Sequence, residues 1–255
     1  MTIKAVIFDI GGVCVGSPIE GIHRYEEKHN LPRDYINVAI VSQGEGGAFQ
    51  RFERGEIKLH DFYKAFGEQL SDPKNKQYYQ KYLTKTGKAN HQLIPDISVN
   101  GQELFHTMMA EAKQIDPYIF QAIQQLKKSK RFILAALTNN FEVPKSDQQE
   151  LQALGDGPPK ILRNSFDHYV ESTVVGLRKP DPRFYLYACK LLGIEPHEAV
   201  FLDDIGGNLR TAKELGMQTI QVKVGRTKEA VKQLEKIVQM DLLLDQNSGD
   251  SGPRL

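Results

Sequence analysis

The sequence has no tryptophan, only two cysteines, no long apolar run and no excess of one charge. Its longest aliphatic or aromatic stretch covers six residues, 132–137, whereas a membrane-spanning helix needs about 20. Its 33 Lys and Arg against 32 Asp and Glu leave a net charge of +1, so a global basic footprint for nucleic acid is absent. Cys14 and Cys189 show neither metal-ligand spacing nor a disulfide framework, which favours a reducing compartment. We therefore expect a cytoplasmic protein with no nucleic-acid or membrane partner.

The length of 255 residues and the 40% apolar and 25% charged content are typical of one large globular domain, or of a core with an insertion. A strand-like run begins at Ala5, which predicts that no signal peptide is present. Residues 246–255 are rich in Ser, Gly and Asp and predict a disordered tail. That tail ends in Pro253-Arg254-Leu255, a variant of the small–basic–Leu peroxisomal address, so a peroxisomal location is the alternative.

Short apolar runs bounded by Gly, Asp or Asn recur along the chain and predict buried β-strands. These runs are 5–8, 132–137, 168–170, 199–202 and the alternating segment 218–224. Apolar residues at helical spacing separate them, over 117–126, 184–192 and 209–215. Because strand and helix alternate, we expect an α/β fold, a Rossmann-like doubly wound parallel sheet with crossover helices.

A long stretch without strand-like runs separates the first two predicted strands. Residues 16–105 carry aromatic residues at helical spacing, such as Phe62 and Phe66. We expect an inserted α-helical cap over 16–105, with the core formed by 1–15 and 106–245. Residues 141–165 form a second, polar insertion whose structure the pattern does not predict.

Side chains able to do chemistry follow three of the predicted strands. They are Asp9, Thr138, Asn139, Asp203 and Asp204, together with Lys179 just before a predicted helix. Ligands of open parallel sheets bind outside the carboxyl ends of the strands, so we expect these groups to converge. Clustered carboxylates repel one another unless a cation lies between them, and oxygen ligands favour Mg²⁺. The hydroxyl, amide and ammonium groups suit a phosphoryl dianion, which Asp9 could then attack.

These motifs, in this order, resemble those of the haloacid dehalogenase superfamily. Within it the chain is most similar to the phosphatase domain at the N-terminus of soluble epoxide hydrolases, and the predicted cap sits where that family carries its first-position cap. The resemblance implies that Asp9 is the nucleophile and that Thr138 and Asn139 bind the phosphoryl oxygens. It also implies that Lys179 neutralises Asp9 and the phosphate together.

The resemblance further implies a Mg²⁺ site. Its ligands are Asp9, the backbone carbonyl of Gly11, and the pair Asp203 and Asp204, which hold the metal directly or through water. Gly11 departs from the family pattern, because most of its phosphatases carry at this position a second Asp that acts as general acid and then base. Such help is typically worth about 10²–10⁴-fold in rate.

The loss of this acid leaves three interpretations open. The substrate has a good leaving group, such as an anomeric sugar phosphate or an acyl phosphate. A cap residue replaces the acid, with Glu20, His23, Glu45 and Arg51 as candidates by placement. Otherwise turnover is vestigial and the protein binds a phosphorylated ligand.

The function that we expect is a Mg²⁺-dependent phosphatase that acts on a small phosphorylated metabolite through an aspartyl-phosphate intermediate. One alternative is the near-inactive binding protein. A second alternative is a metal-free 2-haloacid dehalogenase, although that branch usually has an aromatic residue at the position of Gly11 and no acidic pair like Asp203-Asp204. The sequence predicts neither the natural substrate nor the oligomeric state.

Overall fold

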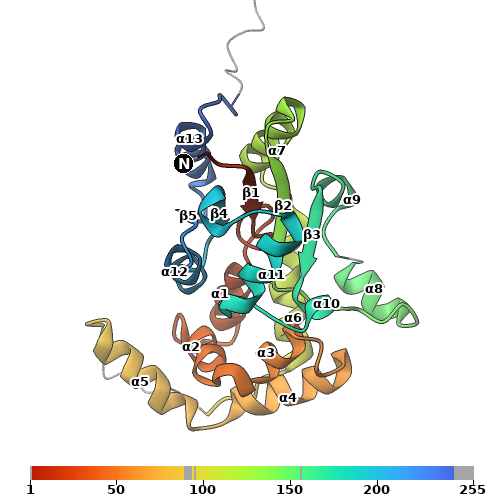
Figure 1. Cartoon of the computed structure of the whole chain (residues 1–255). Helices are drawn as coiled ribbons and strands as arrows, with labels where there is room; N and C mark the ends of the chain where they lie inside the picture. The colour runs from red at the N-terminus through yellow and green to blue at the C-terminus, as the bar shows by residue number, and fades with distance from the viewer. Residues whose placement is uncertain (1, 89–93, 95, 156, 244–255) are drawn as a thin grey trace, which may run out of the picture.

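The computed structural model describes residues 2–88, 94, 96–155 and 157–243. Its centre is a five-stranded parallel sheet in the order β3-β2-β1-β4-β5 (Figure 1). The strands are β1 (Ala5–Phe8), β2 (Ile133–Thr138), β3 (His168–Glu171), β4 (Ala199–Asp203) and β5 (Gln218–Gln221). The order reverses on either side of β1, so the expected doubly wound parallel topology is confirmed.

Four of the five strands have bounds that differ from the sequence prediction. The third and fourth strands each extend one residue further, to Glu171 and Asp203. The second strand begins at Ile133 and includes Thr138. The fifth strand ends at Gln221, although the alternating pattern continues to Val224. Its neighbour β4 ends at Asp203, whose carbonyl accepts a last hydrogen bond from the Val222 amide at 3.0 Å. In the part of the chain that the structure describes, β5 is an edge strand and has no further strand beside it.

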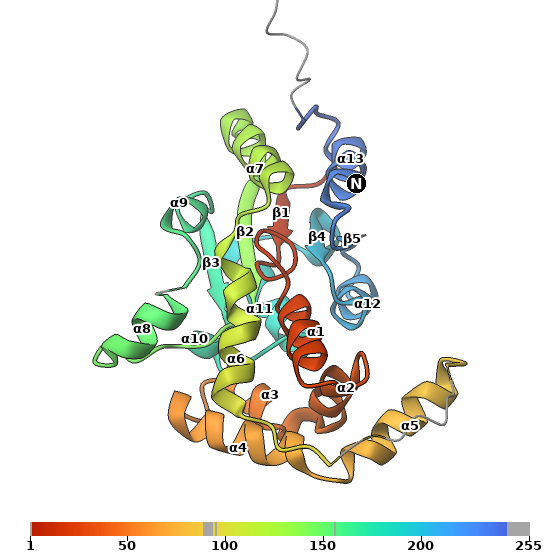
Figure 2. The same cartoon turned by 180° about the vertical axis from the view of Figure 1, so that it is seen from behind.

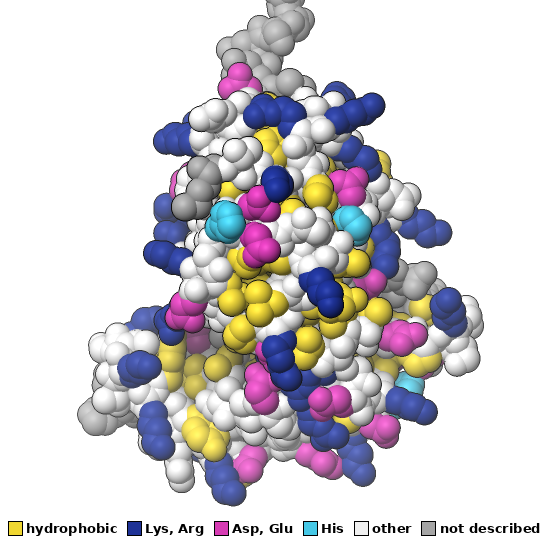
Figure 3. Space-filling model, in the orientation of Figure 1, with side chains coloured by type: hydrophobic (Ala, Val, Ile, Leu, Met, Phe, Trp, Pro, Cys, Tyr) yellow, Lys and Arg dark blue, Asp and Glu magenta, His cyan; other side chains and the backbone are white. Residues whose placement is uncertain are grey.

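Two helical layers cover the sheet because alternate strand residues point to opposite faces. Val6 and Phe8 pack with α7 (Pro117–Ser129) and α13 (Thr227–Val238). Ala5 and Ile7 pack with α11 (Pro182–Leu192) and α12 (Gly206–Glu214). On the outer side of α11, Leu186, Tyr187 and Leu191 are exposed, and apolar side chains gather in the middle of this face (Figure 3).

Helices occupy the stretch predicted as a cap, and the described part of residues 16–105 contains no strand. These helices are α1 (Pro18–Lys28), α2 (Tyr35–Ser42), α3 (Ala48–Glu53), α4 (Leu59–Ser71), α5 (Asn75–Lys85) and α6 (Gly101–Ala110). They share an apolar cluster in which Phe52 and Phe62 stack with ring centroids 4.1 Å apart. The helices lie beyond the carboxyl ends of the strands, and α1 and α6 run side by side between the sheet and the outer cap helices (Figure 2). The expected return to the core at residue 106 falls inside α6.

The second insertion forms α8 (Gln148–Leu154) and α9 (Lys160–Arg163), and α10 (Ser172–Val175) follows β3. The buried carboxylate of Glu150 on α8 accepts hydrogen bonds from Tyr63 Oη at 2.7 Å and Gln102 Nε2 at 2.6 Å, and pairs with His106 Nε2 at 2.7 Å. The insertion is therefore joined to the cap helices α4 and α6. Short 3₁₀ turns cover Gly44–Gly46, Glu111–Lys113 and Pro196–Glu198.

The predicted tail 246–255, with its terminal tripeptide, lies outside the described residues. Within the described part of the chain, every helix is too short or too polar to cross a bilayer.

Candidate functional site

Adjacent parallel strands bring the predicted carboxylates together. β1 and β4 pair so that Phe8 is opposite Leu202, and the Asp9 amide donates to the Leu202 carbonyl at 2.9 Å. The side chain of Asp9 therefore lies beside Asp203 at the end of β4. Ligand oxygens of Asp9, Asp203 and Asp204 all lie within 4.8 Å of one another, as the sheet topology predicts.

The buried side chain of Lys179 forms ion pairs with two of these carboxylates. Its Nζ lies 2.8 Å from Asp9 Oδ2 and 2.7 Å from Asp203 Oδ2, and its side chain is 1% exposed. Burial alone would lower the pKa of Lys179, but Asp203 and Asp9 more than offset this and the pKa is raised. Burial raises the pKa of Asp9, and Lys179 opposes that shift. The lysine thus stays charged and balances part of the acidic cluster.

Asn139 fixes the backbone of that lysine. Its Nδ2 donates to the Lys179 carbonyl at 3.0 Å, and its Oδ1 accepts from the Lys179 amide at 2.8 Å. Both ends of the Asn139 side chain therefore engage the lysine. The neighbouring Thr138 is buried, and its Oγ1 donates to the Asn139 carbonyl at 3.3 Å.

The two carboxylates of the acidic pair differ in how many hydrogen bonds they accept. Asp203 is fully buried, and its Oδ1 accepts a hydrogen bond from the Ile205 amide at 2.7 Å. Both of its carboxylate oxygens lie 3.1 Å from Asn208 Nδ2, and Oδ2 also accepts a hydrogen bond from Lys179 Nζ. Asp204 accepts one hydrogen bond from another side chain of the described chain, Ser17 Oγ at 3.4 Å. Burial, followed by the charge of Asp203, raises the pKa of Asp204 to about 6. Asp204 thus keeps oxygen lone pairs available for a cation, and the all-oxygen set of Asp9 and Asp204 fits Mg²⁺.

Two adjacent glycines play different roles beside the carboxylates. Gly12 has a φ of +76°, and a Cβ there would lie 2.2 Å from Asp204 Oδ2, so only glycine fits. Gly11 is outside the left-handed region, and a Cβ there would first meet Pro18 Cδ at 3.4 Å. A Cβ at position 11 is therefore sterically acceptable.

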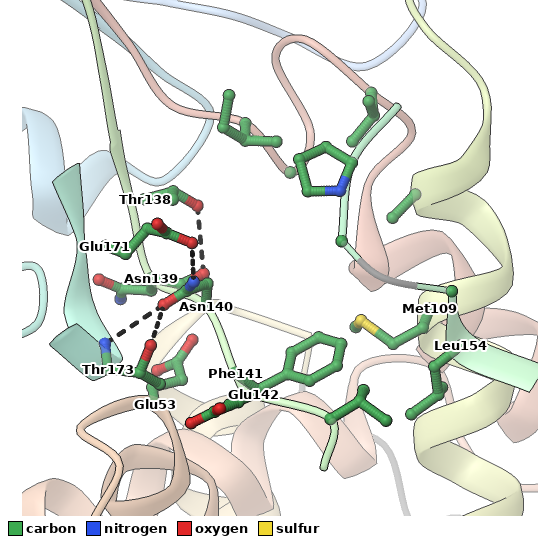
Figure 4. Close-up of a pocket in the computed structure, with 18 of the residues that line it drawn as sticks. Glu53, Met109, Thr138, Asn139, Asn140, Phe141, Glu142, Leu154, Glu171 and Thr173 are labelled. Atoms are coloured by element: carbon green, nitrogen blue, oxygen red, sulfur yellow. Dashed lines mark hydrogen bonds between the residues drawn. The ribbon is translucent and has the colours of Figure 1, made fainter. Parts of the chain in front are cut away.

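A cavity of about 930 Å³ opens next to this cluster, between the sheet end and the cap. Gly11, Thr138 and Asn139 line its end near the sheet. Its walls are largely aromatic and aliphatic and include Phe49, Phe52, Phe105, Met109, Phe141 and Leu154. In Figure 4 the polar side chains of Thr138, Asn139 and Glu171 lie on one side of the cavity, and Glu53 lies near them. The apolar side chains of Phe141, Met109 and Leu154 lie on the other side.

The structure thus brings together Asp9, Lys179, Asp203 and Asp204, with Gly11, Thr138 and Asn139 at the adjoining cavity. The four cap residues predicted to replace the missing acid, Glu20, His23, Glu45 and Arg51, are absent from the described lining. His23 pairs with Asp34 at 3.0 Å and the side chain of Glu45 is 71% exposed. Glu53, which no motif marks, lines the cavity instead.

The sequence is similar to a known protein family and to parts of longer proteins. A sequence model of the haloacid dehalogenase-like hydrolases matches residues 3–216. Mouse acyl-CoA dehydrogenase family member 10 is 35% identical over 94% of this chain and 20% of its own length. Pig bifunctional epoxide hydrolase 2 is 31% identical over 95% of this chain and 40% of its own length. The chain therefore spans less than half of these two longer relatives.

A relative of similar length is the D-ribitol-5-phosphate phosphatase of Bacteroides thetaiotaomicron, 24% identical over 88% of this chain and 93% of its own length. Among solved structures, a HAD family enzyme of the same organism superimposes with a TM-score of 0.55 at 18% identity, covering 91% of this chain and 99% of that one. A dehalogenase superimposes with a TM-score of 0.54, also at 18% identity, over 94% of this chain and 98% of that one. At these identities the superpositions establish the fold, and the fold alone does not separate phosphatase from dehalogenase. With the family match over most of its length, the chain belongs to the haloacid dehalogenase-like hydrolases.

Proposed function

We propose that this hydrolase is a Mg²⁺-dependent phosphatase that acts on a small phosphorylated metabolite through an aspartyl-phosphate on Asp9. The observation that carries the proposal is the buried Lys179 between Asp9 and Asp203, with Asp204 beside them. This cluster can balance the charge of a phosphoryl dianion and a metal at one sheet end. Relatives named as phosphatases of ribitol 5-phosphate and glyceraldehyde 3-phosphate support the same chemistry.

Asp9, Asp204 and the Gly11 carbonyl would hold the Mg²⁺. Asp203 would contribute indirectly, because its oxygens already accept from Lys179, Ile205 and Asn208. When bound, the metal ion offsets the negative charge of the carboxylates and of the phosphoryl oxygens. A HAD family structure from Bacteroides thetaiotaomicron that contains magnesium and inorganic phosphate superimposes with a TM-score of 0.52, which supports the assignment for the family.

In the first step, a carboxylate oxygen of Asp9 attacks phosphorus and the bond from phosphorus to the substrate oxygen breaks. The Ile10 amide donates to Asp9 Oδ1 at 2.6 Å and orients the nucleophile. Lys179 and the Thr138 hydroxyl would bind the phosphoryl oxygens, and Asn139 would act by holding Lys179 in place. In the second step, water attacks phosphorus and Asp9 is released.

The cavity sets limits on the rest of the substrate. Its volume of about 930 Å³ lies in the range of sites that enclose organic ligands. Aromatic and aliphatic walls beyond the polar end near Thr138 suit a phosphate ester with carbon surface to bury.

The proposal is tested by hydrolysis of 4-nitrophenyl phosphate with and without Mg²⁺, by the wild type, Asp9→Asn and a control, Asp61→Asn. Asp61 is an exposed carboxylate on α4, so the control should keep full activity. We expect activity only with Mg²⁺ and its loss in Asp9→Asn. Equal residual activity in Asp9→Asn would contradict the proposal, and halide release from a 2-chloroacid without metal would favour the dehalogenase.

Gly11 favours one second candidate, a protein that binds a phosphorylated ligand with little turnover, because the usual acid is missing. In that case Mg²⁺ together with a phosphate analogue should raise the melting temperature while no phosphate ester is hydrolysed. Brisk hydrolysis of any phosphate ester would exclude this candidate.

A further inference from the structure

A phosphatase without an acid at position 11 needs a proton donor elsewhere for substrates with a poor leaving group. Attacking and leaving oxygens are roughly in line during phosphoryl transfer. Asp9 approaches from the sheet, so the leaving oxygen faces the cap, which lies beyond the carboxyl ends of the strands (Figure 2). The donor is therefore expected on a cap element that reaches the cavity.

Glu53, the last residue of α3, meets this requirement. It lines the cavity together with Thr138 and Asn139, and Figure 4 shows its carboxylate near this polar group. Its side chain is 11% exposed. Burial raises the pKa of Glu53, while Arg178 and then Lys179 oppose the shift. A carboxyl shifted upward is closer to the range in which it can give and take a proton near neutral pH.

Contacts with the core fix Glu53 in place and leave one of its oxygens available. Arg178 Nε donates to Glu53 Oε2 at 2.7 Å, and Ser172 Oγ donates to the Glu53 backbone carbonyl. Within the described chain, Glu53 Oε1 accepts no hydrogen bond, and this atom is open to the cavity or solvent. The carboxyl is thus held at one oxygen and open at the other.

The other two carboxylates of the cavity lining are less suitable. Both oxygens of Glu171 accept from Arg163, at 3.1 and 2.6 Å, and Oε1 also accepts from Asn140. Glu142 is exposed to solvent. Glu53 is the buried carboxyl with a free oxygen within the described lining.

We propose that Glu53 is the general acid and base of the reaction and takes the role that Gly11 cannot fill. This inference rests on the proposed phosphatase function. As Asp9 forms its bond to phosphorus, the bond to the leaving oxygen breaks, its electron pair stays on that oxygen, and the proton of Glu53 joins it to give the free alcohol. The Glu53 carboxylate then takes a proton from the water that attacks phosphorus, the bond between Asp9 and phosphorus breaks, and Glu53 is protonated again.

The test compares kcat/KM for hexyl phosphate, a poor leaving group, with kcat/KM for 4-nitrophenyl phosphate, which leaves without protonation. For Glu53→Gln we expect a loss of about 100-fold or more on the alkyl ester and little change on the aryl ester. The control is Glu45→Gln, because Glu45 also faces Arg178, at 3.7 Å, but is 71% exposed and outside the described cavity lining. In this control, kcat/KM for hexyl phosphate and kcat/KM for 4-nitrophenyl phosphate should both stay at the wild-type values.

A double variant separates lost chemistry from lost positioning. A Cβ at position 11 would make only ordinary contact with Pro18, so adding Gly11→Asp to Glu53→Gln should restore alkyl phosphate turnover. An equal loss on both esters, an unchanged alkyl rate, or no recovery in the double variant would overturn the proposal for Glu53 while the phosphatase function stands. If the wild type hydrolyses neither ester, the phosphatase function fails and this role fails with it.

Discussion

Replacement of Gly12 by Ala tests whether the loop after β1 is built around Asp204. At φ +76° an L-residue costs about 1–2 kcal/mol relative to glycine. The new Cβ would lie 2.2 Å from Asp204 Oδ2, and relieving such an overlap costs typically about 1–3 kcal/mol. We therefore expect Gly12→Ala to lose about 2–5 kcal/mol in the free energy of unfolding, measured by urea denaturation without metal. Because Asp204 must move, we also expect a smaller increase in melting temperature on addition of Mg²⁺.

Gly11→Ala is the matched control, because the new Cβ would meet only Pro18 Cδ, at 3.4 Å, and the backbone is outside the left-handed region. Reduced freedom of the unfolded chain should leave its stability unchanged or raise it by up to about 1 kcal/mol. If both variants had the same stability and the same response to Mg²⁺, the close approach of Gly12 to Asp204 would be refuted.

Two further predictions follow from buried charge. Lys179→Met leaves the carboxylates of Asp9 and Asp203 without their shared cation, so we expect a loss of about 3 kcal/mol or more in urea denaturation, and a loss below about 1 kcal/mol would contradict this. Burial raises the pKa of Glu26 to about 7, against the hydrogen bonds from the amides of Ile36 and Asp34. The folded state therefore binds its proton more tightly than the unfolded state. The stabilisation from this proton is present below about pH 4.5 and should be lost as the pH rises to about 7. Glu26→Gln should make the free energy of unfolding depend less on pH over this range. An identical pH dependence in the variant and the wild type would contradict the raised pKa of Glu26.

The sequence predicts the sheet and the convergence of the carboxylates because both follow from local signals. Runs such as 199–202 are buried on both faces and bounded by acidic or glycine residues, which is the pattern of a central parallel strand. Once Asp9 and Asp203 follow parallel strands, the topology brings them to the same edge whatever their distance along the chain.

Features set by long-range packing could not be predicted in this way. The role of Glu53 depends on where α3 meets the core residues Ser172 and Arg178, more than 100 positions away in sequence. The sequence around α8 shows no pattern that predicts its structure. Its buried residue Glu150 is held by side chains of the cap helices, which are distant in sequence. Asn139 was expected to bind phosphate, and its engagement with the Lys179 backbone became visible only in three dimensions.

The most direct test of the central claim is to trap the covalent intermediate. The wild type is mixed with excess aryl phosphate and Mg²⁺, quenched in acid within one turnover, and digested for mass spectrometry. We expect one added phosphoryl group on the peptide that contains Asp9, absent in Asp9→Asn. Turnover by the wild type with no phosphorylated peptide at Asp9, or with the group on another residue, would contradict the account.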